Sequence, residues 1–144
     1  MRRSTTFSIP TERGEQIRAL AKFNRTSVSG LVSDWIDHEI KIKGLSDKIP
    51  GVSTATEGHT ATLEMEGLTI TFPTKNEAGS FVDAMERVTT RSGVFGMLVG
   101  DDMLSIKRAG SGVVVERNSE RRSFAPNVAL MVANQLRAVA TNCA

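Results

Sequence analysis

The chain has 144 residues, of which 40% are hydrophobic and 24% charged, as is typical of a globular protein and not of a disordered or fibrous one. The formal net charge is +2, but residues 1–44 carry +3 and the rest −1, so the basic excess lies in the N-terminal third. Cys143 is the only cysteine, which excludes a disulfide within the chain and fits a cytoplasmic protein. No apolar run approaches the roughly 20 residues of a membrane-spanning helix, so we expect no membrane partner.

Residues 4–9 alternate in the manner of a half-buried strand. One face has Thr5, Phe7 and Ile9, and the other has three hydroxyl-bearing residues: Ser4, Thr6 and Ser8. Pro10 cannot continue a strand ladder, but its fixed φ suits the first turn of a helix. The alternation therefore predicts a short strand that ends at Pro10.

Two helices are predicted after this strand. From Thr11 the apolar residues recur at helical spacing, and Asn24-Arg25-Thr26 interrupts that pattern. A second helix follows Ser27-Val28-Ser29, which offers two serine N-caps, and Gly44 ends it. The apolar stripe of this second helix consists of Val28, Leu31, Val32, Trp35, Ile36 and Ile40.

A lone strand and two helices cannot form a stable unit by themselves. The strand would leave its N–H and C=O groups unpaired, and about 45 residues bury too little apolar surface. Two copies remove both difficulties, because the strands pair antiparallel and the apolar faces share one core. The sequence thus predicts a homodimer with its core formed by Phe7, Ile9, Leu20, Leu31, Trp35 and Ile36 of both chains.

Residues 2–43, under a third of the chain, resemble the ribbon-helix-helix (Arc/MetJ-type) DNA-binding domain. The resemblance is carried by Ser8-Ile9-Pro10, Ile17, Leu20-Ala21-Lys22 and Ser27-Val28-Ser29-Gly30-Leu31-Val32. It implies that the outward strand residues Ser4, Thr6 and Ser8 contact bases in the major groove. It also implies that Ser27, Val28 and Ser29 hold the DNA backbone, where a helix N-terminus presents free N–H groups to phosphate.

Several positions depart from the pattern of this family. Arg25 stands where the turn usually has glycine, so Asn24 or Arg25 has to adopt a left-handed conformation. Arg13 replaces an apolar residue, and Gly30 replaces a glutamate that would support the helix cap. The base-contacting face also lacks side chains that bond a base through two atoms. Arg2 and Arg3 are candidates for that contact and for phosphate binding alike; we place Arg3 with the base-contacting set and Arg2 with the backbone-contacting set.

The rest of the chain is expected to form a linker, residues 45–58, and a small α+β domain, residues 59–144. Alternating residues predict two strands that meet at a Glu66-Gly67 turn. Thr74-Lys75-Asn76-Glu77 is a capping-box pattern that precedes a helix. Three further strands near 94–99, 103–107 and 113–117 and a final helix near 126–140 complete a ββαβββα order. The overall fold class is α+β, with an N-terminal ribbon-helix-helix unit, residues 1–44.

No catalytic, cofactor-binding or metal-binding constellation is evident in the sequence. His38 and His59 each lack a second ligand at metal spacing. Gly110-Ser111-Gly112 precedes a strand, as a hairpin turn does, and not a helix, as a phosphate-binding loop does. We interpret Asp101-Asp102 as a solvated turn and the Glu120-Arg121-Arg122 stretch as a solvated strand end and loop, with a supplementary DNA-backbone contact as the alternative. We expect no enzyme and no cofactor.

The sequence therefore favours a transcriptional regulator, a repressor, that binds double-stranded DNA as a homodimer or tetramer. Its C-terminal domain would join dimers or sense a signal. One alternative is a plasmid or phage accessory protein for partition or relaxosome assembly, whose C-terminal domain recruits a protein partner. An antitoxin is less favoured, because residues 59–144 look able to fold alone.

Overall fold

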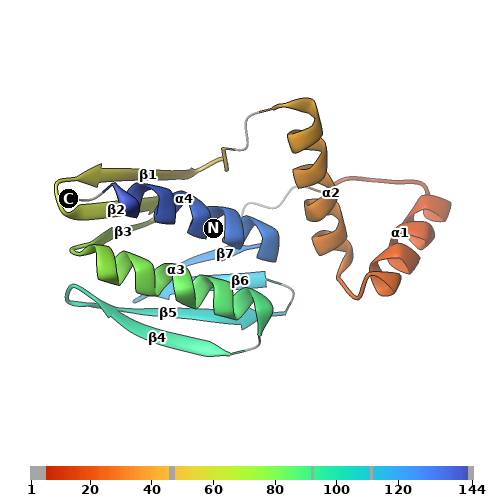
Figure 1. Ribbon diagram of the computed structural model, residues 1–144. Coiled ribbons are helices and arrows are strands. Elements are labelled where there is room, and N and C mark those ends of the chain that lie inside the picture. Colours follow the sequence, from red (N-terminus) through yellow and green to blue (C-terminus); the bar gives the residue numbers. More distant parts are fainter. Residues whose placement is uncertain (1–5, 46–47, 92, 111, 143–144) are drawn as a thin grey trace.

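The computed structural model describes residues 6–45, 48–91, 93–110 and 112–142. The protein is mixed α+β, as predicted, with two helices ahead of a larger unit of strands and helices (Figure 1). The helices are α1 (Thr11–Phe23), α2 (Val28–Lys43), α3 (Lys75–Thr90) and α4 (Pro126–Thr141). The strands are β1 (Val52–Glu57), β2 (Thr60–Met65), β3 (Leu68–Phe72), β4 (Val94–Val99), β5 (Asp102–Ala109), β6 (Gly112–Arg117) and β7 (Glu120–Phe124).

The larger unit contains two antiparallel sheets with a helix after each. One sheet has the order β1-β2-β3 and the other the order β4-β5-β6-β7. Helices α3 and α4 run side by side over one face of these sheets (Figure 1). Helix α3 follows the first sheet but packs mainly on β4 and β5 of the second, whereas α4 packs mainly on β1 and β2. Each helix therefore covers the sheet that it does not directly follow.

Alternation along the strands places the core between the sheets and the helices. In β2 and β3, Leu63, Ile70 and Phe72 are fully buried, while the threonines between them face outward. The ring of Phe72 meets that of Phe81 from α3, with 5.2 Å between the ring centroids. Apart from Ala21, every buried hydrophobic residue lies between Ala61 and Ala140. The protein thus has one hydrophobic core, and it belongs to the larger unit.

Local sequence signals account for the turns and helix starts of this unit. Glu66 and Gly67 connect β2 to β3, and Met65 pairs with Leu68 as the spacing predicted. Gly67 has a φ of +82°, a conformation that favours glycine. The predicted capping box is present at α3: the Thr74 hydroxyl accepts from the Glu77 N–H, and the Glu77 carboxylate accepts from the Thr74 N–H.

Two strands depart from the predicted ββαβββα order. Val52–Glu57 forms the edge strand β1 within the expected linker, and Glu120–Phe124 forms β7 where a strand end and loop were expected. Neither segment has the apolar alternation that marks a half-buried strand. Strand β1 has Ser53, Thr54 and Thr56, and β7 begins with three charged residues. Pairing with β2 and β6 forms these strands in spite of their composition.

The predicted N-terminal strand is absent from the single chain over the described part of its range. Residues 6–10 have no regular structure and pair with no described strand. The physical reason lies in the prediction itself, whose only proposed ladder partner was the same segment of a second chain. The specific ribbon-helix-helix arrangement is therefore not seen in the isolated chain.

No helix within the described ranges combines the length and the apolar character that crossing a membrane requires.

Candidate nucleic-acid interface

The N-terminus of α2 has the features of an anion-binding helix start. Ser27 has an extended conformation, and its hydroxyl accepts a hydrogen bond from the Gly30 N–H at 3.0 Å. Ser27 is thus the N-cap, as the sequence predicted. Because the first N–H groups of a helix have no partner within it, those of Val28 and Ser29 remain available at this end. Helix α2 ends at Gly44 in a left-handed conformation, also as predicted.

The turn between α1 and α2 resolves the alternative that the sequence left open. Arg25 has a φ of +53°, while Asn24 is the ordinary C-cap of α1 with a φ of −81°. The Arg25 and Thr26 N–H groups donate to the carbonyls of Lys22 and Ala21. Arg25 is exposed two residues before the Ser27 cap, so its positive charge lies close to the start of α2.

Gly30 has a spatial reason that the sequence did not reveal. A Cβ built on Gly30 would overlap the Thr26 hydroxyl and would lie 3.2 Å from the hydroxyl oxygen of Ser27. The absence of a side chain therefore lets Thr26 and the Ser27 cap pack closely over the first turn of α2. In this chain the position that the family fills with glutamate contributes space.

The described members of the predicted base-contacting face, Thr6 and Ser8, are exposed. Their apolar neighbours are exposed too: Phe7 by 82% and Ile9 by 53%. Arg2, Arg3 and Ser4 lie outside the described residues. The segment that was predicted to contact bases thus presents both hydroxyl and apolar side chains to solvent.

Most of the predicted dimer core is exposed in the single chain. Trp35 is 61% exposed, Leu20 54% and Ile36 46%, and Leu31 is partly buried. In α1 and α2 the only described residues that are buried are Gly14, Ala21 and Gly30, which have little or no side chain. The two helices therefore meet through small residues and direct their large apolar side chains outward.

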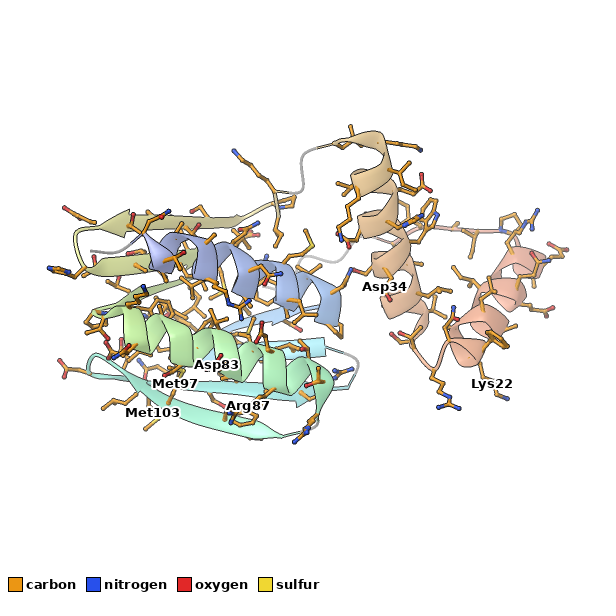
Figure 2. The ribbon with its side chains drawn as sticks, in the orientation of Figure 1. Lys22, Asp34, Asp83, Arg87, Met97 and Met103 are labelled. Carbon is orange, nitrogen blue, oxygen red and sulfur yellow. The ribbon has the colours of Figure 1, made fainter. Side chains whose placement is uncertain are left out.

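Sequence patterns missed two further members of this apolar surface. Ile42 is 65% exposed and Leu45 is 62% exposed, near the C-terminal end of α2. Both lie outside the predicted helical stripe, so periodicity gave no signal for them. Figure 2 shows Lys22 at the end of the helix pair that lies away from the larger unit, and Asp34 on α2.

The larger unit reaches the N-terminal half of α2 at two places. The Ser33 hydroxyl donates to the side-chain carbonyl of Asn127 in α4 at 2.6 Å. A shallow hollow is lined by Ser29 and Gly30 on one side and by β7 and the start of α4 on the other. Within it, Arg122 lies 4.0 Å from the Glu66 carboxylate and over the ring of Phe124. Arg121 is exposed on β7, so a cation of the larger unit borders the same hollow as Ser29.

Neither histidine forms a metal site with its surroundings. His38 and His59 belong to no group of three or more histidine, cysteine, aspartate or glutamate side chains suited to a metal ion, within the part of the chain that the structure describes.

Comparison with known proteins identifies no relative: no protein-family model, curated protein or solved structure matches this chain.

Proposed function

We propose that the protein is a sequence-specific DNA-binding regulator that acts as a homodimer, with residues 1–44 as a ribbon-helix-helix unit. One observation carries the proposal: the large apolar side chains of this unit are exposed while its buried residues are small. Scattered apolar residues on a surface are ordinary, but a contiguous set such as Phe7, Leu20 and Trp35 marks an interaction site.

A second copy is the partner that suits this surface best. Pairing of residues 4–9 with the same residues of the partner would satisfy backbone groups that have no partner in the single chain. It would also direct Phe7 and Ile9 against the apolar residues of α2. The hydroxyls of Thr6 and Ser8, with that of Ser4, would then line the outer face of a two-stranded ribbon, which fits the major groove of B-DNA.

The charges and helix ends of the unit support DNA as its ligand. Eight lysine and arginine residues lie within residues 1–44 against five acidic ones. The free N–H groups at Val28 and Ser29, with Arg25 beside them, suit a phosphate of the DNA backbone. In this proposal Thr6, Ser8, Ser4 and Arg3 contact bases, and Arg2, Ser27, Val28 and Ser29 contact the backbone.

Dimerisation is tested through Trp35, the single tryptophan of the chain. As protein concentration rises, we expect its fluorescence emission to shift to shorter wavelength, because a shared core would remove its indole ring from water. Phe7→Glu should abolish the shift and halve the mass in solution, whereas Phe23→Glu, at a residue outside the proposed core, should preserve both. Emission that does not change with concentration would contradict the shared core.

DNA binding is tested with one variant for each class of contact. Ser27→Asp retains a good N-cap residue but adds a negative charge, so it should weaken binding to operator and random DNA alike without loss of helix. Thr6→Ala should instead lower the ratio of operator to random affinity, by roughly two- to tenfold if one hydrogen bond is lost. Thr71→Ala, at an exposed threonine of β3, is the control. If Thr6→Ala leaves the ratio unchanged, the assignment of the base-contacting face is wrong.

The role of a DNA-processing accessory protein differs in output and not in how DNA is bound. Capture of a second protein by the larger unit would favour partition or relaxosome assembly. Derepression of a gene next to the bound site, on deletion of the protein, would favour the regulator. Affinity should in both cases fall steeply as salt concentration rises, because bound phosphates release counterions.

A further inference from the structure

Strand β4 is the outer strand of the four-stranded sheet and pairs with β5 alone among the described strands. The Arg108 N–H donates to the Gly93 carbonyl, and the register places Val94 opposite Lys107 and Gly96 opposite Ser105. Hydrogen-bonding direction alternates along an antiparallel strand. The backbone N–H and C=O groups of Val94, Gly96 and Leu98 therefore point away from β5, toward the open edge.

The side chains at this edge are apolar and exposed. Val94 is 69% exposed and Leu98 60%, and Leu98 lies opposite Met103, which is also 60% exposed. Figure 2 shows Met97 on the side of the sheet that α3 covers and Met103 on the side away from it. Natural edge strands are commonly protected by charges, proline or bulges, yet Val94–Val99 contains no charged residue and no proline. The edge strand of the other sheet, β1, is polar by contrast.

We propose that β4 pairs antiparallel with β4 of a second copy of this chain, about a two-fold axis through Gly96. Residues that pair across two strands share one face of the sheet, so outward residues have to meet outward residues. The register centred on Gly96 meets this condition and places Val94 opposite the partner's Leu98. On the covered face it places Phe95 opposite the partner's Met97. The two four-stranded sheets then form one continuous sheet of eight strands.

Charge complementarity favours a second copy as the occupant of this edge. Arg91 lies just before β4 and Asp101 just after it, both exposed, and neither forms an ion pair with another described residue. Antiparallel pairing brings the beginning of one strand beside the end of the other. The register centred on Gly96 also places Arg91 opposite the partner's Asp101, so opposite charges meet at both ends of the joined strands.

This surface is separate from the N-terminal unit, and the inference does not rest on DNA binding. Pairing of the N-terminal strands and pairing of β4 would join a chain to two different partners. Together they can close an assembly of four chains. Loss of one contact leaves the other intact, so the two proposals fail independently.

The register can be tested by disulfide trapping in the full-length protein. Gly96→Cys, made together with Cys143→Ser, places two thiols across the axis, where facing residues of a hydrogen-bonded pair are about 5.5 Å apart, within disulfide range. The structure accommodates this side chain, since a Cβ on Gly96 lies 3.9 Å from the nearest side-chain atom outside its own turn of chain, the Met103 sulfur. Mild oxidation should yield covalent dimers. Ser105→Cys, one strand further from the axis on the same face, should yield none, and equal trapping of both variants would overturn the register.

Charge substitutions test the same contact without a cross-link. Val94→Lys alone and Leu98→Glu alone should each halve the mass in solution, because each buries an unpaired charge in the joined edge. The two changes combined in one chain should restore the mass, since each lysine would then face a glutamate of the partner. Val94→Lys combined with Leu98→Lys should not restore it. All these positions are exposed, so circular dichroism should remain unchanged, and a mass that is insensitive to these variants would overturn the proposal.

Discussion

Gly30 and Thr26 form a pair whose roles depend on each other. The Thr26 hydroxyl occupies the space into which a side chain at position 30 would project, and Thr26 is stiff because it is β-branched. A glycine early in α2 costs helix propensity, about 1 kcal/mol relative to alanine. The chain tolerates that cost because the first turn of α2 and the preceding turn pack without a gap.

We expect Gly30→Ala to destabilise the protein by about 1–3 kcal/mol, as overpacking does. The same substitution in a Thr26→Ala background should stabilise it, because the overlap is gone and the gain in helix propensity remains. The free energy of unfolding of the four proteins in this cycle measures the coupling. Additive effects of the two substitutions would show that the overlap is relieved elsewhere.

Helix α3 is joined at its first turn to the turn between β4 and β5. The Gly100 N–H donates to one oxygen of the Glu77 carboxylate at 3.2 Å, and Thr74 binds the other oxygen. These bonds, that from Gly100 first, lower the pKa of Glu77 below its usual value near 4.5. The capping box thus belongs to a larger contact that connects α3 to the second sheet.

The lowered pKa of Glu77 predicts how stability depends on pH. A carboxyl whose pKa is lower in the folded than in the unfolded protein stabilises the fold fully above its unfolded pKa. That contribution is lost as pH falls from about 4.5 through the folded pKa. The loss of stability caused by Glu77→Gln should therefore be largest at neutral pH and shrink below pH 4. Urea unfolding at pH 7 and pH 3 measures this, with Glu57→Gln as an exposed control; a constant difference would contradict it.

At the scale of the whole molecule, the two parts of the chain differ in what they bury. The core extends from Ala61 to Ala140, and the crossed packing of α3 and α4 makes each half of the larger unit depend on the other. The N-terminal helices bury only small residues and contact the larger unit through few groups, among them Ser33 and Asn127.

Fragments of the chain should unfold according to this division. A fragment of residues 48–144 should unfold cooperatively near the melting temperature of the full protein. Residues 48–92 alone should not fold, because α3 then lacks β4 and β5. Residues 1–45 should gain helix only as their concentration rises. Circular dichroism melts measure all three, and a folded 48–92 fragment would refute the interdependence of the two halves.

The sequence by itself determined the elements whose signals are local. Capping residues, a glycine turn and regular apolar spacing were enough to place α2, α3, α4 and the hairpin at Glu66-Gly67, because these signals act over a few residues. They also predicted the α+β class. The DNA-contacting role of Thr6, Ser8 and Ser27 stays a prediction that rests on a resemblance.

Only the tertiary structure decided the strands and contacts that depend on a neighbour. Strands β1 and β7 are polar or charged, and pairing with β2 and β6 forms them, which no local pattern records. The packing of α3 and α4 over each other's sheets and the open edge at β4 likewise follow from contacts distant in sequence. For the same reason residues 6–10 remain irregular in one chain, since a strand needs a partner to supply its hydrogen bonds.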